Sequence, residues 1–174
     1  MTEEKLSLEG LVFEAIELAL DNHILTIRLN RPERKNAINA AMAAEIVYAL
    51  DYAKQEREIR VVVLAANGDV FCAGGDLALM GGQSQESIST VPIRGKQDDL
   101  ALRFRHLNKP CIACVQGNVF ACSWLFLCNV THVIAAEGVK FSAPEIKRGI
   151  WPFMVMGGLF RVMQIGRASC RERA

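Results

Sequence analysis

A glycine-rich turn at residues 72–76 is the first place in this sequence where residue types and spacing suggest chemistry. Ala73, Gly74 and Gly75 follow an apolar run, and the chain then leads toward a helical stretch. Glycines let backbone N–H groups approach a ligand closely, and a helix start adds partial positive charge. The turn suits an oxyanion hole or a phosphate cradle, and an ordinary tight turn is the alternative. The pattern is neither G-x-G-x-x-G nor a P-loop, which argues against a nucleotide site.

A second turn, at residues 116–123, contains Gly117 and Cys122 and also follows an apolar run. The crevice beyond the carboxyl ends of parallel strands is where open α/β sheets bind ligands. Two such turns lying side by side would aim two N–H groups at one carbonyl oxygen. Because this turn is poor in glycine, an ordinary connection is the better interpretation when it is taken alone.

Glu145 is a carboxylate within the otherwise apolar loop 142–146. Removal from water favours the protonated form of such a group, which suits proton transfer near neutral pH. A glutamate directly after a proline is also a common helix start, so a capping role stays open.

The remaining reactive side chains form no recognisable centre. Cys111 and Cys114 make a C-x-x-C, but the further ligands of a zinc site are missing. We therefore predict no metal, and reduced cysteines that serve as small apolar residues. The three histidines, His23, His106 and His132, do not have the spacing of a catalytic triad or of metal ligands. Ser123 does not lie in the G-x-S-x-G motif of a nucleophile elbow.

Composition places the chain among soluble globular proteins. Of its 174 residues, 51% are hydrophobic and 22% are charged, which fits one domain with a sizeable core. Twenty Lys and Arg against nineteen Asp and Glu leave a net charge of +1, so we expect neither nucleic acid nor a membrane as a partner. No apolar run is long enough for a membrane span, and residues 1–5 do not resemble a signal peptide. We therefore expect a cytoplasmic protein.

The first elements are predicted from hydrophobic periodicity. Alternation at period two predicts a hairpin with strands at residues 12–20 and 23–29, joined by a turn at Asp21-Asn22. Apolar residues at spacings of three and four then predict a helix over residues 40–55, with Asn39 as its N-cap.

Strands and helices alternate after that helix. Continuous apolar runs at residues 60–66, 110–115 and 132–136 predict strands buried on both faces. Helices are expected at residues 98–107 and near residues 122–128. This alternation predicts an α/β layered fold.

Four ordered blocks of the sequence together resemble the enoyl-CoA hydratase/isomerase (crotonase) superfamily. They are NRPERKNAIN at residues 30–39, FCAGGDL at 71–77, VQG at 115–117 and FSAPEIKRG at 141–149. The resemblance implies an α/β fold of the crotonase-like ββα spiral (ClpP/crotonase) kind that binds an acyl-CoA thioester. It also implies a homo-oligomer, a trimer or a dimer of trimers, with no cofactor beyond the coenzyme A of the substrate.

The resemblance assigns roles to particular residues. The backbone N–H groups of Gly75 and Cys122 would hold the thioester oxygen as an enolate develops, and Glu145 would move the proton. The positions implied to bind substrate are Ala37, Ala73, Gly74, Gly75, Asp76 and Leu77.

Glu145 matches the second catalytic glutamate of the family, whereas the first catalytic glutamate of the two-glutamate hydratases falls on Leu125, which can neither hold a water nor move a proton. This leaves a one-carboxylate proton shuttle, as an isomerase would use, or a different activity of the family. The alternative is an inactive relative that keeps the fold or the binding of CoA esters.

The C-terminal region has two expected features. Residues 1–164 are expected to form a crotonase-like core domain without the family's last helices, and residues 165–174 resemble a translated sequencing adapter rather than native sequence. Without those helices, apolar side chains near the end of the core would be exposed. They are Phe153, Met154, Val155, Met156 and Phe160.

Overall fold

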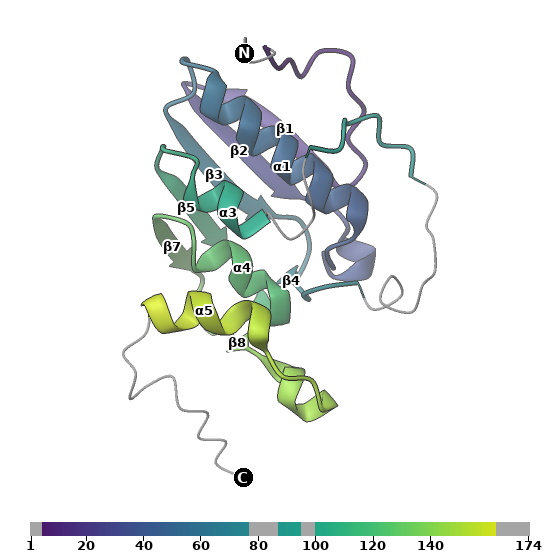
Figure 1. Ribbon diagram of the computed structural model, residues 1–174, viewed down its shortest axis with the longest axis vertical. Coiled ribbons are helices and arrows are strands. Elements are labelled where there is room, and N and C mark those ends of the chain that lie inside the picture. Colours follow the sequence, from purple (N-terminus) through teal and green to yellow (C-terminus); the bar gives the residue numbers. More distant parts are fainter. Residues whose placement is uncertain (1–4, 77–86, 95–99, 163–174) are drawn as a thin grey trace.

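The structure is a computed structural model that describes residues 5–76, 87–94 and 100–162 (Figure 1). Leu77 and the segment 165–174 lie outside the described residues, so the predictions made for them stay predictions. Within the described ranges, every helix is too short or too polar to cross a lipid bilayer.

The predicted hairpin is confirmed, but its turn lies at Asn22-His23, one residue later than predicted. It consists of antiparallel strands β1 (Ile16–Asp21) and β2 (Ile24–Leu29), and the two residues between them, Asn22 and His23, both have positive φ. Such a turn matches the right-handed twist of the paired strands. Strand β1 begins at residue 16 rather than 12 because the backbone N–H groups just before it donate to a side chain of the first helix.

One five-stranded sheet forms the centre of the molecule, in the order β1-β2-β3-β5-β7. Strands β3 (Val61–Ala66), β5 (Cys111–Val115) and β7 (His132–Ala135) run parallel to β2. Helices α1 (Ala40–Gln55), α3 (Leu100–Arg105) and α4 (Trp124–Leu127) lie along one face of this sheet (Figure 1).

Helix α1 has the predicted bounds, and the Asn39 side chain accepts a hydrogen bond from the Met42 N–H at 2.8 Å, as an N-cap does. Helix α3 confirms the described part of the helix expected at 98–107. The helix expected near 122–128 is a 3-10 turn, η3 (Ala121–Ser123), followed by the single turn α4.

The prediction of a buried strand at 132–136 is wrong. Strand β7 lies at the edge of the sheet and all four of its residues are exposed, Ile134 at 62%. An apolar run has the same composition whether its faces are covered or bare, so the sequence could not distinguish the two cases.

The last described helix, α5 (Phe153–Val162), leaves Phe153 and Phe160 exposed as predicted. Val155 is buried, which corrects the expectation for that residue. The reason is that α5 packs against α4: a Cβ placed on Gly158 would lie only 2.8 Å from the Cβ of Cys128. The side chain of Met154 is outside the described set.

A second, three-stranded parallel sheet carries the turns of interest. Its strands β4 (Val70–Cys72), β6 (Asn118–Phe120) and β8 (Phe141–Ser142) lie in the order β4-β6-β8. A 3-10 helix, η4 (Pro144–Arg148), follows β8. Strands of two or three residues are too short to show an alternating pattern, so β6 was not predicted.

A fully buried carboxylate joins α1 to the start of β1. Glu45 accepts hydrogen bonds from the backbone N–H groups of Glu14, Ala15 and Ile16 at 2.7, 2.9 and 3.0 Å. Charge-assisted bonds of this kind satisfy the buried carboxylate and fix where the strand begins.

We expect Glu45→Gln to lower the free energy of unfolding by about 2–3 kcal/mol, because an amide NH₂ would then face backbone donors in a buried site. Urea unfolding followed by circular dichroism measures the change. Exposed Glu33→Gln is the control and should stay within about 0.5 kcal/mol of wild type. Equal stability of the two variants would contradict this role of Glu45.

Candidate active site

The structure brings the two predicted turns into contact. Strands β4 and β6 pair in parallel, with Cys72 opposite Val119, so the chains that follow them emerge side by side. A Cβ built on Gly74 would lie 2.7 Å from the Ala121 Cβ and 3.3 Å from the Cys122 backbone nitrogen. Gly74 also has φ of +93°, so this position requires glycine for both its conformation and its space.

The backbone N–H of Gly75 is turned toward the second turn. Ile38 forms a parallel bridge with Gly75: its N–H donates to the Gly74 carbonyl at 2.8 Å, and its carbonyl accepts from the Asp76 N–H at 2.9 Å. Because peptide groups alternate in direction along an extended chain, the N–H of Gly75 itself faces away from Ile38. It donates instead to the sulfur of Cys122.

The Cys122 thiol therefore lies against the first donor. Burial raises the pKa of this thiol, the Gly75 N–H lowers it in part, and the negative charge of Glu145 raises it further. A Cβ built on Gly75 would lie 3.9 Å from the Cys122 sulfur, so the thiol lies beside the Gly75 loop. A ligand oxygen that uses the Gly75 N–H must displace the thiol.

Glu145 comes to this place through β8 and η4. Its Oε2 atom is buried and makes no hydrogen bond within the described part of the chain. The strand that delivers it is held by Trp124, whose indole N–H donates to the Ser142 carbonyl at 3.3 Å and whose ring packs on Phe141. An unsatisfied buried carboxylate oxygen costs free energy, and such groups are often catalytic.

Leu125 occupies the position that the resemblance matches to the hydratases' first catalytic glutamate, and its side chain is apolar. It lines a cavity of about 100 Å³ together with Val155 and Arg161, between α3, α4 and α5. Glu145 does not line that cavity. The described part of the site thus contains two carboxylates, Glu145 and Asp76, and the second of these is paired with Arg31.

The other predicted binding positions form one framework around Gly75. The Ala37 carbonyl accepts a hydrogen bond from the Arg31 guanidinium, and the Ala73 N–H donates to the Lys35 carbonyl at 2.9 Å. The Asp76 carboxylate is buried and paired with Arg31. Sequence reasoning did not identify Arg31, whose only signal was its place in the NRPERKNAIN block.

The cysteines are mostly core residues. Burial raises the pKa of Cys72 to about 11 and that of Cys111 to about 12, so both thiols stay protonated at neutral pH. Cys114 is exposed, which corrects the prediction that it is buried. Cys111 and Cys114 are three residues apart in β5 and so face opposite sides of the sheet. In the described ranges, no three potential metal ligands lie together.

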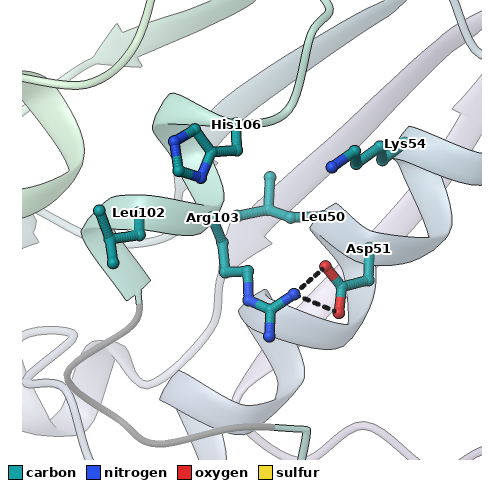
Figure 2. A pocket seen from close by; sticks show the side chains of 6 residues that line it. All are labelled: Leu50, Asp51, Lys54, Leu102, Arg103 and His106. Carbon is teal, nitrogen blue, oxygen red and sulfur yellow. Dashed lines mark hydrogen bonds and ion pairs between the residues drawn. The ribbon is translucent and has the colours of Figure 1, made fainter.

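A larger cavity lies apart from this site. It has a volume of about 230 Å³ and lies between α1 and α3, where Arg103 bonds both oxygens of Asp51 at 2.9 and 3.1 Å (Figure 2). None of the predicted site residues lines it.

Solved structures share this arrangement of sheets and helices. One, an enoyl-CoA hydratase/isomerase from Marinobacter aquaeolei, matches with a TM-score of 0.76 at 25% sequence identity, covering 88% of this chain and 60% of that one. The two sheets and their flanking helices therefore form the crotonase fold, which confirms the predicted fold class.

The sequence comparisons give the family. The family model for enoyl-CoA hydratase/isomerase matches residues 19–173, and this chain belongs to that family. It is 35% identical to 2,3-dehydroadipyl-CoA hydratase of Escherichia coli, over 74% of this chain and 49% of that protein. It is 30% identical to trans-2-decenoyl-[acyl-carrier-protein] isomerase of Streptococcus mutans, over 90% of this chain and 61% of that protein. The chain thus spans about half to three fifths of these relatives.

Ala121, which directly precedes Cys122 in the second turn, has a strained backbone conformation. Ala121 has φ of +51°, in the left-handed region that disfavours a Cβ. The turn is held in this conformation by the buried hydroxyl of Ser123, which lies 2.6 Å from the Phe120 carbonyl and 2.9 Å from the Cys72 carbonyl.

We expect Ala121→Gly to raise the free energy of unfolding by about 0.5–1 kcal/mol. The strain relieved is about 1–2 kcal/mol, and the added freedom of the unfolded chain offsets part of it. Urea unfolding provides the measurement. Ala44→Gly within helix α1 is the matched control and should destabilise by about 1 kcal/mol. If both substitutions destabilise equally, Ala121 is not strained.

Proposed function

We propose that this protein is an acyl-CoA enzyme that stabilises a thioester enolate with two backbone N–H groups and moves a proton with one glutamate. The observation that carries the proposal is the Oε2 atom of Glu145, which is buried and has no hydrogen-bond partner among the described residues; the charge of Glu145 also raises the pKa of the Cys122 thiol. Family membership supports the acyl-CoA class of substrate, since the two relatives are named as a CoA-ester hydratase and an acyl-carrier isomerase.

The proposed reaction moves a double bond in a 3-enoyl-CoA. The Glu145 carboxylate takes a proton from C2, and the electron pair of that C–H bond moves onto the thioester oxygen. The N–H groups of Gly75 and Cys122 stabilise the resulting dienolate, as oxyanion-hole donors do. Protonated Glu145 then returns the proton to C4, and the double bond comes to lie between C2 and C3.

Leu125 favours isomerisation over hydration. Adding water requires a group that holds and activates the water in addition to the group that moves the proton at C2. An apolar side chain at position 125 provides no such group. Proton return by the same carboxylate needs no activated water, and no cofactor beyond the coenzyme A of the substrate takes part.

A second candidate is a binding protein for CoA esters without turnover. The observation that favours it is the Cys122 thiol, which occupies the Gly75 N–H that a thioester oxygen would need. In either case we propose that copies of the chain associate, because Val133 and Ile134 of edge strand β7 expose apolar surface at 42% and 62%.

Wild-type protein should isomerise a 3-enoyl-CoA faster than it hydrates crotonyl-CoA, and Glu145→Gln should abolish isomerisation. Glutamine keeps the shape of the side chain but accepts no proton at neutral pH, so affinity for the CoA ester should be nearly unchanged. Spectrophotometric assays of both reactions, with calorimetry for binding, test this.

Exposed Glu137→Gln is the matched control and should keep the wild-type rate. Rapid hydration by the wild type, or activity that persists in Glu145→Gln, would show that another group carries the proton. Tight binding without turnover in the wild type would support the second candidate instead.

A further inference from the structure

We propose that Arg31 is a positioning residue that holds the Gly75 N–H in its active direction and neutralises Asp76 beside it. This inference rests on the proposed function, because it concerns the donor that would receive the thioester oxygen. It extends that function to a residue that contacts neither the substrate nor the reacting atoms.

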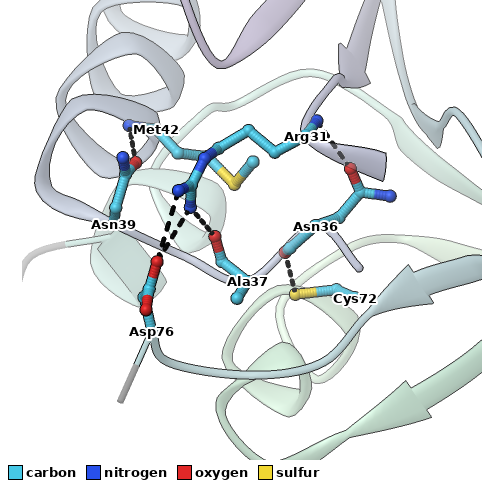
Figure 3. Close-up of polar contacts among 7 residues, drawn as sticks. All are labelled: Arg31, Asn36, Ala37, Asn39, Met42, Cys72 and Asp76. Carbon is cyan, nitrogen blue, oxygen red and sulfur yellow. Dashed lines mark hydrogen bonds and ion pairs between the residues drawn. The ribbon is translucent and has the colours of Figure 1, made fainter. Parts of the chain in front are cut away.

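The Arg31 guanidinium forms hydrogen bonds to both of the segments that meet at the Ile38–Gly75 bridge (Figure 3). Nη1 of Arg31 donates to the Ala37 carbonyl at 2.6 Å and to Oδ2 of Asp76 at 3.2 Å, and Nη2 reaches the same Oδ2 at 3.3 Å. Ala37 precedes Ile38 and Asp76 follows Gly75. The three hydrogen bonds of the guanidinium, called the fork below, therefore join the two segments next to the Ile38–Gly75 bridge. Any change in this fork therefore acts on the bridge that directs the Gly75 N–H.

Arg31 is itself fixed by Asn36, which is fully buried. The Arg31 N–H donates to Oδ1 of Asn36 at 2.8 Å, and the Asn36 N–H donates back to the Arg31 carbonyl at 2.8 Å. These bonds close the loop around the 3-10 turn η1 (Pro32–Arg34). The Asn36 amide also donates to the carbonyls of Asn67 and Val70, which anchors the loop beside β4. These hydrogen bonds hold the backbone of Arg31 in place, and so restrict where its guanidinium can lie.

The charge of Arg31 matters as much as its shape. Asp76 is the residue directly after the proposed donor, and its carboxylate is 9% exposed. An unpaired negative charge there would oppose negative charge developing on a thioester oxygen, because buried charges are poorly screened. Arg31, 6% exposed, places its positive charge against that carboxylate. The pair thus removes a negative charge that would oppose an enolate at this donor.

The main test compares Arg31→Met with the double variant Arg31→Met/Asp76→Leu. Loss of Arg31 alone strands a buried charge, so both stability and kcat should fall, kcat by about 10²-fold with KM nearly unchanged. The double variant removes both charges and should recover stability. It lacks the fork, however, so its kcat should stay low. A pair with only a structural role would recover kcat together with the melting temperature, and that result would overturn the proposal.

A second readout does not depend on turnover. Hydrogen exchange by NMR reports the Ile38 and Asp76 amides, whose bonds form the bridge, and we expect at least about tenfold faster exchange in Arg31→Met. Arg31→Lys keeps the charge without the fork and should show the same increase, which covers the case in which Arg31→Met does not fold.

The matched control is Arg103→Met, which breaks the Arg103–Asp51 pair at the other cavity and should change neither kcat nor these two amides (Figure 2). Wild-type protein that is inert toward enoyl-CoA esters would refute the proposed function, and the exchange rates would still decide whether Arg31 positions the loop. Unchanged exchange at both amides in Arg31→Lys would overturn the positioning role.

Discussion

The parallel bridge between Ile38 and Gly75 is the constraint on which the candidate site depends. It uses the carbonyl of Gly74 and the N–H of Asp76, and so turns the N–H of Gly75 toward the neighbouring turn. The close packing at Gly74 and the positive φ of Ala121 occur where the two turns meet. Backbone geometry rather than side-chain identity thus sets the direction of the Gly75 N–H.

Buried ionic groups hold the frame around this bridge. Glu45 fixes the start of β1 by accepting three backbone N–H groups, and Arg31 joins the two chains of the bridge through Ala37 and Asp76. Each charged group is satisfied by several bonds, which is the condition under which a buried charge can be kept. Glu145 differs because one of its oxygens is buried without a partner among the described residues. That difference supports the proposed role of Glu145 in proton transfer.

The local elements were largely predictable from the sequence, because their causes are local. The helix over 40–55 was found with its cap, and the hairpin and strands β3 and β5 followed from periodicity and turn chemistry, although one face of β5 is partly exposed. The predictions were wrong or incomplete where the burial or pairing of a strand depends on segments that are distant in the sequence. Strand β7 is as apolar as a buried strand yet is exposed. The three-residue strand β6 is defined by its pairing with β4 and β8.

The candidate site was predictable to a similar degree. Turn chemistry predicted that the two turns meet, which the structure confirms, whereas the roles that the resemblance gives to Gly75, Cys122 and Glu145 stay predictions. Two features had no sequence signal: the direction of the Cys122 thiol, toward the Gly75 N–H, and the pairing of Arg31 with a residue 45 positions away. Both depend on three-dimensional packing between segments far apart in the chain.

The claim that the Gly75 N–H receives the thioester oxygen is tested most directly by infrared spectroscopy of a bound enoyl-CoA labelled with ¹³C at the thioester carbonyl. Wild-type protein should shift the carbonyl stretch to lower frequency, because hydrogen bonding to the oxygen weakens the C=O bond. Gly75→Ala keeps the N–H, and a Cβ there would lie 3.9 Å from the nearest atom, the Cys122 sulfur, so this control should retain the shift. Gly75→Pro removes the N–H and should lose it. An unshifted carbonyl in wild type, or a full shift in Gly75→Pro, would contradict the account.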